Sequence, residues 1–233
     1  MRYRSPDLRT QDPEEYAKRI RTNPYLEEVY AHPDWIVVHP TPERFAEAWA
    51  SRAQGCERIH LEIGCGSGRY LTEWAGRHPQ DAFLGLELRY KRLALSARKL
   101  QQRQLSNVLL MRERGEYFDE YFGPGSLDVL HVNFPDPWPK KGHAKNRLMS
   151  PEFLLRFRPY LRPEGEIRFK TDHPDYFAWV GETLRGLSEY RVLDDTDHLQ
   201  HSVHAEENIL TEFELLFRSK GDPPIGYLRA GIA

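Results

Sequence analysis

Cysteine is scarce in this sequence of 233 residues, which contains only Cys56 and Cys65. Two cysteines are too few for a disulfide framework or for a zinc site with four cysteine ligands. Long apolar runs are lacking as well: no stretch approaches the roughly 20 residues of a membrane-spanning helix, and no basic start leads into an apolar run. We therefore expect a soluble, cytoplasmic protein with reduced thiols and no membrane partner.

An excess of charge of either sign is also lacking. The chain has 33 lysine and arginine residues against 35 aspartate and glutamate residues, for a formal net charge of −2 at pH 7. It is not a polycation, so any affinity for nucleic acid has to come from local clusters of basic residues. Hydrophobic residues make up 39% of the chain, which argues against global disorder and suffices for the core of one large α/β domain.

Short apolar runs alternate with amphipathic segments from about residue 58 onward. The apolar runs predict strands, mostly buried on both faces, at residues 58–63, 82–87, 107–111, 127–133 and 165–171. The amphipathic segments predict helices at residues 69–77, 89–104, 150–161 and 175–187. Ser150, followed by Pro151, is the expected N-cap of the third helix. This alternation indicates a parallel sheet with right-handed crossovers, closed by further strands at residues 190–195 and 213–220.

Residues 1–50 do not follow this alternation. About the first 20 residues mix arginine and lysine with aspartate and glutamate, and an aromatic, proline-rich run then leads into the short helical pattern PERFAEAWA. We expect an N-terminal extension with a loose start, packed on a single domain of residues 51–233.

The segment EIGCGSGRY leads from a predicted strand into a predicted helix through a glycine loop of residues 64–68. Glycine at such a turn lets the backbone approach a ligand closely. The Gly-x-Gly-x-Gly spacing differs from the usual dinucleotide fingerprint, and Glu62, just ahead of the loop, would repel a pyrophosphate. Glu87 ends the next strand, where such folds bind ribose hydroxyls. The pattern favours a cationic nucleoside without phosphates, S-adenosylmethionine, with a nicotinamide dinucleotide or a purely structural turn as the alternatives.

The segment NFPDPWP, residues 133–139, follows the fourth predicted strand at the edge where ligands bind in open parallel sheets. Its prolines restrict the backbone around Asp136, which lies between Phe134 and Trp138. We interpret this segment as the stiff lip of a pocket, with a proline-rich turn as the alternative. The basic run at residues 140–147 favours contact with RNA phosphates over a merely solvated surface.

The glycine loop and its two acids resemble the cofactor site of class I S-adenosylmethionine-dependent methyltransferases. The segments NFPDPWPKKGHAKNRL, FKTDHPDYF and TEFE, in this order, resemble those of the bacterial tRNA (guanine-N7)-methyltransferase family. The resemblance implies a Rossmann-like α/β fold, with a largely parallel seven-stranded sheet, helices on both faces and an antiparallel last strand. It implies methyl transfer from S-adenosylmethionine to N7 of a guanosine in tRNA, usually guanosine 46 of the variable loop.

The resemblance also implies roles for individual residues. The implied cofactor contacts are Glu62, Gly64, Gly66, Gly68, Glu87, Arg114 and Asp136. The implied catalytic residues are Asp136 and Asp172. The implied substrate contacts are Lys140, Asp172, Thr211, Glu212, Phe213 and Glu214. The implied RNA contacts are Gly142, His143, Ala144, Lys145, Asn146 and Arg147.

Arg114 departs from the family pattern. The family usually has an aspartate after this strand, which accepts a hydrogen bond from the adenine amine, and a gapless match of MRERGE places Arg114 there. An arginine side chain has no hydrogen-bond acceptor. Glu113, a backbone carbonyl or packing against the adenine ring are the alternatives for this contact.

The implied reaction needs no general base. Guanine N7 carries a lone pair and no proton, so it can attack a sulfonium methyl group directly once the two are positioned. Asp136 or Asp172 could stabilise the developing charge, and Glu214 could accept hydrogen bonds from the Watson–Crick edge of the base. A methyltransferase for exocyclic base amines or protein side chains, and an RNA-binding module without turnover, are the alternative functions.

The histidines predict no metal site. His198, His201 and His204 lie in a stretch where neither a cysteine nor a patterned carboxylate completes a ligand set, so we expect a polar surface loop. His131, inside the fourth predicted strand, is expected in the core or on a face of the sheet. A monomer and a homodimer are both compatible with the sequence.

Overall fold

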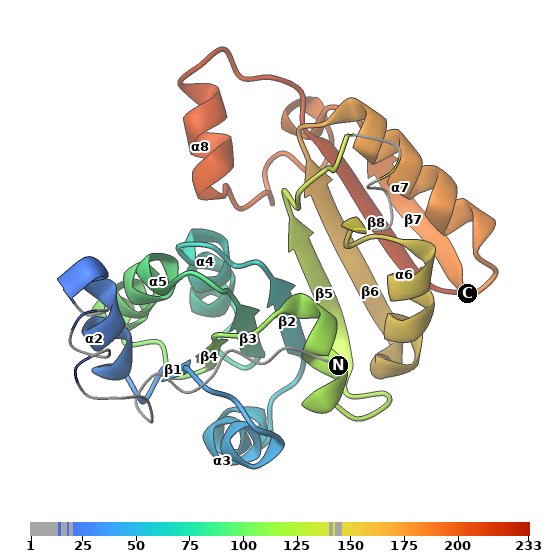
Figure 1. Ribbon diagram of the computed structural model, residues 1–233. Coiled ribbons are helices and arrows are strands. Elements are labelled where there is room, and N and C mark those ends of the chain that lie inside the picture. The colour runs from blue at the N-terminus through green and yellow to red at the C-terminus, as the bar shows by residue number, and fades with distance from the viewer. Residues whose placement is uncertain (1–13, 15–17, 19–20, 140–141, 143–145) are drawn as a thin grey trace.

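The computed structural model describes residues 14, 18, 21–139, 142 and 146–233 (Figure 1). The strands are β1 (Ile36–Val37), β2 (Ile59–Ile63), β3 (Ala82–Leu86), β4 (Val108–Met111), β5 (Leu127–Asn133), β6 (Leu161–Thr171), β7 (Tyr190–Thr196) and β8 (Gly226–Ile232). The α-helices of these described residues are α2 (Tyr25–Tyr30), α3 (Pro42–Ala53), α4 (Arg69–Arg77), α5 (Tyr90–Arg103), α6 (Pro151–Phe157), α7 (Pro174–Gly186) and α8 (Glu212–Arg218). The 3-10 helices whose bounds fall within the described residues include η2 (Gly115–Glu120), η4 (Arg158–Tyr160) and η5 (Leu199–His201).

The strands form one sheet in the order β1-β4-β3-β2-β5-β6-β8-β7. Strands β1 to β6 run parallel, and β8 is antiparallel to both of its neighbours, β6 and β7. Helices α2, α4 and α5 pack on one face of the sheet, and α3, α6 and α7 pack on the other. Successive strand residues alternate between the two faces, so Phe83 packs with the apolar side chains of α2, α4 and α5, and Leu84 packs with those of α3, α6 and α7. The predicted α/β class, with a largely parallel sheet covered on both faces, is confirmed.

The described sheet has eight strands where we expected seven, because the segment before residue 50 contributes β1. Ile36 pairs in parallel with Leu110 at the edge of the sheet. The N–H of Leu110 donates to the carbonyl of Trp35 at 2.7 Å, and the indole Nε1 of Trp35 donates to the carbonyl of Leu105 at 2.9 Å. A strand of two residues has no periodic signal of its own, so only its pairing identifies it. The expected loose start lies almost entirely outside the described residues.

The strand predicted at residues 213–220 is wrong, because this segment lies in helix α8 as far as Arg218. Thr211 Oγ1 accepts a hydrogen bond from the N–H of Glu214 at 3.1 Å, and Glu214 Oε2 accepts one from the N–H of Thr211 at 2.8 Å. This reciprocal capping box starts the helix. The antiparallel strand is β8 instead, whose sequence GYLRAGI has two glycines and an arginine and therefore a weak strand signal.

Most other predicted boundaries agree with the structure. Helix α4 and strand β5 have the predicted bounds. Ser150 caps α6 as expected, with its Oγ accepting from the N–H of Phe153 at 3.2 Å. This helix is shorter than predicted, because Pro159 has no N–H to continue the hydrogen-bond ladder and η4 follows. Among the described residues, each helix is too short or too polar to span a membrane.

The edge that carries the candidate site is formed by the carboxyl ends of the central strands. The chain moves outward from β2 through β3 to β4 and then returns to the opposite side of β2 as β5. In open α/β sheets such a reversal leaves a crevice beyond the strand ends, where ligands bind. The glycine loop follows β2 and the lip follows β5, so both lie at this crevice (Figure 1).

Replacing Gly68 by alanine should destabilise the protein, because Gly68 starts α4 with a φ of 77° and lies against Ser96 on α5. A Cβ at this position would lie 2.5 Å from Ser96 Oγ, and the left-handed backbone adds its own cost. We expect Gly68→Ala to lower the free energy of unfolding, measured by urea denaturation, by about 2–4 kcal/mol.

A Ser96→Gly change in the same protein separates the two costs. Because it removes the clashing side chain, the double variant should lose less free energy of unfolding than the sum of the two single losses. Gly123→Ala is the matched control, since a Cβ there meets no atom within 4 Å and should change stability little. Strictly additive losses in the double variant would show that the contact with Ser96 is unimportant.

Candidate active site

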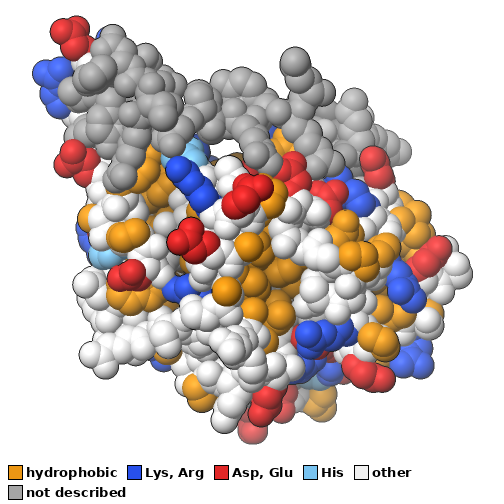
Figure 2. All heavy atoms as spheres, turned by 90° about the horizontal axis from the view of Figure 1, so that it is seen from below, with side chains coloured by type: hydrophobic (Ala, Val, Ile, Leu, Met, Phe, Trp, Pro, Cys, Tyr) orange, Lys and Arg blue, Asp and Glu red, His pale blue; other side chains and the backbone are white. Residues whose placement is uncertain are grey.

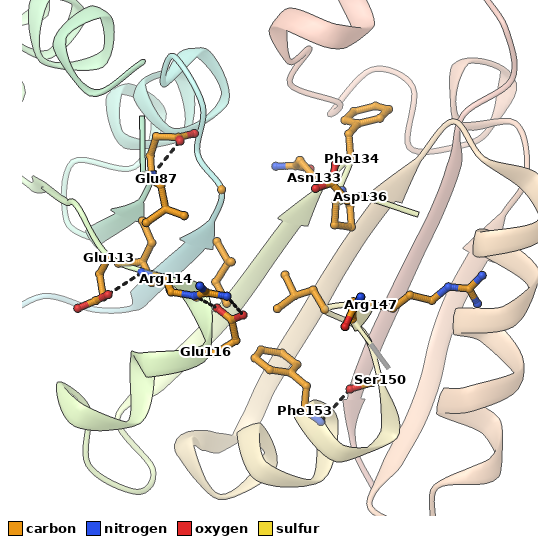
Figure 3. A pocket seen from close by; sticks show the side chains of 18 of the residues that line it. Glu87, Glu113, Arg114, Glu116, Asn133, Phe134, Asp136, Arg147, Ser150 and Phe153 are labelled. Carbon is orange, nitrogen blue, oxygen red and sulfur yellow. Dashed lines mark hydrogen bonds and ion pairs between the residues drawn. The ribbon is translucent and has the colours of Figure 1, made fainter. Parts of the chain in front are cut away.

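A cavity of about 800 Å³ opens at the carboxyl edge of the central strands. Two walls face each other across it (Figure 3). One wall comes from the ends of β3 and β4 and the start of η2, and the other from the lip and the start of α6. Of the residues expected at the site, those lining the cavity are Gly64, Glu87, Arg114, Asp136, Asn146, Arg147 and Phe213.

Glu62 lies inside β2 with 2% of its surface exposed. Asn133 Nδ2 donates a hydrogen bond to Glu62 Oε1 at 2.8 Å, whereas Oε2 has no hydrogen-bond partner among the described residues. Burial raises the pKa of this carboxyl to about 8. Glu62 does not itself line the cavity, but Ile63, Gly64 and Asn133 next to it do. A buried, unpaired carboxyl oxygen at this place suits a ligand that donates a hydrogen bond or carries positive charge.

The glycine loop divides into an open part and a packed part. Gly64 has a φ of 78° and no atom within 4 Å of the place where a Cβ would stand, so its backbone faces open space. Its N–H and that of Cys65 donate to the carbonyl of Leu86 at 2.8 and 3.0 Å, which ties the loop to β3. Gly68 instead packs against α5. Cys65 is buried, and burial raises the pKa of its thiol well above the ordinary value, so it is an inert packing residue.

The Glu87 carboxylate is held rigidly at the end of β3. Its Oε1 accepts hydrogen bonds from the N–H groups of Leu88 and Arg89 at 2.8 and 2.9 Å. Its Oε2 lies 3.5 Å from Nη1 of Arg92. Because Oε1 already accepts two hydrogen bonds, Oε2 is the oxygen that keeps acceptor capacity for a ligand. This arrangement fits the expected role of Glu87, which is to accept hydrogen bonds from ribose hydroxyls.

Glu113 and Arg114 are neighbours on the same wall, but their side chains diverge. Glu113 is buried, and its carboxylate accepts hydrogen bonds from the N–H of Arg114 and from the hydroxyl of Tyr121, both at 2.8 Å. The Arg114 guanidinium pairs with Glu116 at 3.0 Å and is about half exposed (Figure 3). Of these two neighbours, only Glu113 offers a side-chain acceptor.

The lip leaves β5 with unusual backbone angles. Phe134 has a φ of 51° and Trp138 a φ of 43°, although neither is glycine. The N–H of Phe134 donates to the carbonyl of Lys170 on β6 at 2.8 Å. Between these two residues Asp136 lines the cavity, and its exposed carboxylate forms no hydrogen bond or ion pair with a described residue. The cavity thus receives one carboxylate that remains available to a ligand.

Glu214 lies outside the cavity lining, in a buried polar cluster below α8. Its Oε2 lies 3.4 Å from Lys170 Nζ, and its Oε1 accepts from Nδ2 of Asn208 at 2.8 Å. Lys170 also donates to the carbonyl of Ile209 at 3.0 Å, and burial lowers the pKa of its ammonium group. Thr211 is buried as the N-cap of α8. The helix residue that does line the cavity is Phe213.

Glu212 faces the start of α4. Its Oε1 accepts hydrogen bonds from Lys99 Nζ at 2.8 Å and from the N–H of Arg69 at 3.2 Å. Arg69 Nε also donates to the carbonyl of Leu210 at 3.1 Å. These contacts attach α8 to the helix that follows the glycine loop, and α8 lies above α4 in Figure 1.

The remaining expected residues are placed as follows. Asp172 is exposed just after β6 and does not line the cavity, but β6 pairs with β5, so Asp172 and the lip share one edge of the sheet. Gly142 and Asn146 are exposed. The expected contacts that lie outside the described residues are Lys140, His143, Ala144 and Lys145.

Some cavity residues were missed from the sequence. Asn133 pairs with Glu62 and lines the cavity, and a polar residue ending an apolar strand at the binding edge was a readable signal. Ser150 and Phe153 of α6 also line the cavity. Nothing local in the sequence places that helix next to the lip, so these two could not be predicted.

The histidines occupy two environments. His131 is buried in the sheet as expected, where its Nε2 lies 3.0 Å from His60 Nδ1 and its Nδ1 lies 2.9 Å from the hydroxyl of Tyr70. The rings of His198 and His201 lie 4.6 Å apart. The described part of the chain contains no group of three histidine, cysteine or acidic side chains placed to hold a metal ion.

Three features define a class I methyltransferase. A glycine loop follows β2, acids stand at the ends of β2 and β3 in a parallel sheet whose strand order reverses, and the antiparallel strand β8 is inserted near the far edge. Solved structures share this fold. The 16S rRNA (adenine(1408)-N(1))-methyltransferase from Catenulisporales acidiphilia matches with a TM-score of 0.56 and 19% identity, over 83% of this chain and 94% of that chain. An antibiotic-related methyltransferase matches with a TM-score of 0.56 and 15% identity, over 80% of this chain and 94% of that chain.

Sequence comparisons identify the family. A family model described as "Putative methyltransferase" matches residues 56–225. A tRNA (guanine-N7)-methyltransferase of Enterococcus faecalis is 37% identical over 87% of this chain and 94% of that protein, and one of Lachnoclostridium phytofermentans is 36% identical over 88% and 94%. A bifunctional glycosyltransferase/methyltransferase of Fusobacterium nucleatum is 34% identical over 91% of this chain, which spans only 33% of that longer protein. The chain belongs to the tRNA (guanine-N7)-methyltransferase family, and its methyl donor is S-adenosylmethionine.

We expect the protein without ligand to lose stability, relative to a Glu62→Gln variant, as the pH rises. The pKa of the Glu62 carboxyl lies near 8 in the fold against an ordinary value of 4.5. Protonated Glu62 therefore stabilises the fold fully below pH 4.5, and this contribution is lost as the pH rises through about 8. Urea denaturation of both proteins at about pH 5 and pH 8.5 measures the difference. If the two proteins differ in unfolding free energy by the same amount at both pH values, the pKa of Glu62 is not raised in the fold.

Proposed function

We propose that this protein transfers the methyl group of S-adenosylmethionine to N7 of guanosine 46 in the variable loop of tRNA. The observation that carries the proposal is that the glycine-loop side and the lip side line one cavity. Gly64 and Glu87 lie on the first side, and Asp136 lies on the second. A donor held on the first side would therefore present its methyl group to a base that meets the lip.

The residues present fit the methyl donor. The unpaired Glu62 Oε2 and the open space at Gly64 suit the cationic amino-acid part, and the fixed carboxylate of Glu87 suits the ribose hydroxyls. Bound there, S-adenosylmethionine supplies an electrophilic methyl group on a sulfonium. The protein contributes mainly position, because guanine N7 has no proton to lose.

Asp136 is the proposed catalytic carboxylate. The base becomes cationic as N7 is methylated, and a carboxylate facing the cavity stabilises that charge. Two aromatic side chains at the cavity, Trp138 and Phe213, are partly exposed and suited to stacking on a flipped base. Asp172, at the same edge of the sheet, remains a proposed substrate contact.

The tRNA is proposed to bind through the basic residues that follow the lip in the sequence, Lys140, Lys141, His143 and Lys145. On the face shown in Figure 2, basic and acidic side chains of the described residues are interspersed, so that face offers no broad basic surface. A local basic run is therefore the better phosphate site. We place the reaction in the cytoplasm, with the protein acting as a monomer or a homodimer.

Glu113 is the proposed acceptor for the adenine amine, because it is a buried carboxylate at the cavity lining, whereas the neighbouring Arg114 guanidinium offers only donors and is paired with Glu116. The wild-type protein should bind S-adenosylhomocysteine about tenfold more tightly than the analogue whose adenine lacks the amine. Glu113→Ala should abolish this preference, and Arg114→Ala should retain it. Calorimetric titration of the three proteins with both ligands measures it. If Glu113→Ala keeps the tenfold preference, a backbone carbonyl accepts from the amine, and if the wild-type protein shows no preference, packing holds the adenine.

The reaction is tested with unmodified tRNA and labelled S-adenosylmethionine, followed by mapping of 7-methylguanosine by strand scission. We expect one site of scission, at guanosine 46, and no label in tRNA that carries adenosine there. Asp136→Asn should lower the single-turnover rate by about 10²-fold, because it removes the charge that stabilises the methylated base.

Each other outcome favours a different function. Label on an exocyclic amine would indicate a methyltransferase of another specificity. Binding of both tRNA and S-adenosylmethionine without transfer would indicate an RNA-binding module that has lost turnover. Scission at another guanosine would support methylation of guanine N7 but would show that guanosine 46 is not the target.

A further inference from the structure

The lip is a strained segment that needs an external support. Phe134 and Trp138, on either side of Asp136, both have left-handed backbone angles, which cost a residue with a Cβ about 1–2 kcal/mol each. Such conformations persist only where surrounding contacts impose them. The Phe134 end has a hydrogen bond to Lys170 and a stacked neighbour in Phe213, with 5.9 Å between the ring centroids. The Trp138 end needs a support of its own.

Arg147 supplies that support. Its Nε donates to the carbonyl of Pro137 at 2.9 Å, and its Nη2 donates to the carbonyl of Trp138 at 3.4 Å. Both bonds hold the backbone immediately after Asp136. The side chain is half-buried and extends toward α7 (Figure 3). A guanidinium group can make both contacts at once because its donors are arranged in a rigid fork.

The flat face of the guanidinium group stacks on two aromatic side chains of α7. Its central carbon lies 4.6 Å from the ring centroid of Trp179 and 5.2 Å from that of Tyr176. Tyr176 is fully buried and packs edge-on against Phe169 of β6, with 5.5 Å between the ring centroids. The contacts therefore form a continuous path from the core of the sheet through α7 and Arg147 to the lip.

We propose that Arg147 is a positioning residue for methyl transfer, which fixes the lip and hence the Asp136 carboxylate in the cavity. The proposal rests on the proposed function, and it replaces the RNA contact that the sequence resemblance implied for Arg147. A phosphate contact needs little more than a positive charge near the RNA. The observed contacts need a planar fork of donors and a flat face for stacking, which lysine lacks.

Arg147→Lys separates these two roles, because it keeps the charge and loses the fork and the stacking. In single-turnover assays with saturating tRNA and S-adenosylmethionine, we expect the rate to fall by about 10–100-fold, as a displaced catalytic group would cause. The tRNA dissociation constant should stay within about twofold of wild type, and the slope of its logarithm against the logarithm of salt concentration should not change.

Arg112→Lys is the matched control. The Arg112 guanidinium also stacks on an aromatic ring, 4.4 Å from the centroid of Tyr90, and its Nε donates to a backbone carbonyl, that of Leu88, at 3.1 Å. It does not touch the lip and does not line the cavity. Arg112→Lys should therefore keep the wild-type rate, whereas a general cost of replacing a stacked arginine would slow both variants.

The opposite pattern would overturn the proposal. If Arg147 contacts a phosphate, Arg147→Lys should transfer methyl at close to the wild-type rate. Arg147→Ala should then weaken tRNA binding and reduce the salt slope by about 0.7–0.9, with the rate at saturating tRNA retained. Urea denaturation of each variant shows whether a slow protein is still folded.

A second measurement keeps the inference testable without activity. In protein labelled with 5-fluorotryptophan, the resonance of Trp138, assigned with a Trp138→Phe variant, should shift or broaden in Arg147→Lys and stay unchanged in Arg112→Lys. An unchanged Trp138 resonance in Arg147→Lys would refute the support of the lip. If the wild-type protein makes no 7-methylguanosine, the proposed function fails, and this fluorine signal still decides whether Arg147 holds the lip.

Discussion

The hydrogen bond between Asn133 and Glu62 joins the two strands on which the whole site depends. It lies inside the sheet at the point where the strand order reverses, with β2 leading into the glycine loop and β5 leading into the lip. Both halves of the cavity therefore start from one rigid junction and not from independent loops, and a site built on sheet strands is positioned more accurately than one built on loops alone. Burial raises the pKa of the carboxyl at this junction to about 8, which favours its neutral form.

The central part of the fold could be predicted from the sequence because its signals are local. The apolar runs of β2 to β5 are buried on both faces, and α4 carries its apolar residues at helical spacing. Glu62 and Glu87 stand at the ends of such strands, so a parallel sheet brings them to one edge. The position of Asp136 at the cavity followed from the same rule, because the lip leaves the strand next to β2.

What could not be predicted depends on contacts between distant segments. Thr211 begins the T-x-x-E signature of a capping box, but the apolar residues after it also suit a strand, and only the packing of α8 settles the choice. The sequence predicts that Glu214 accepts hydrogen bonds from a base. In the structure its buried carboxylate accepts them from Lys170 and Asn208. Arg147 looked like one more member of a basic run, and its partners on α7 are about 30 residues further along the chain.

The cluster of Lys170, Asn208 and Glu214 has a consequence for how such a protein can change its specificity. Leaving a buried ammonium group without its carboxylate costs free energy of folding, so this cluster tolerates few substitutions. It fixes the position of α8 relative to the sheet. Phe213, on the same helix, forms no hydrogen bond with that cluster and lines the cavity. Divergence toward another base can therefore proceed by exchange of Phe213 together with its stacking partner Phe134, while the attachment of the helix stays constant.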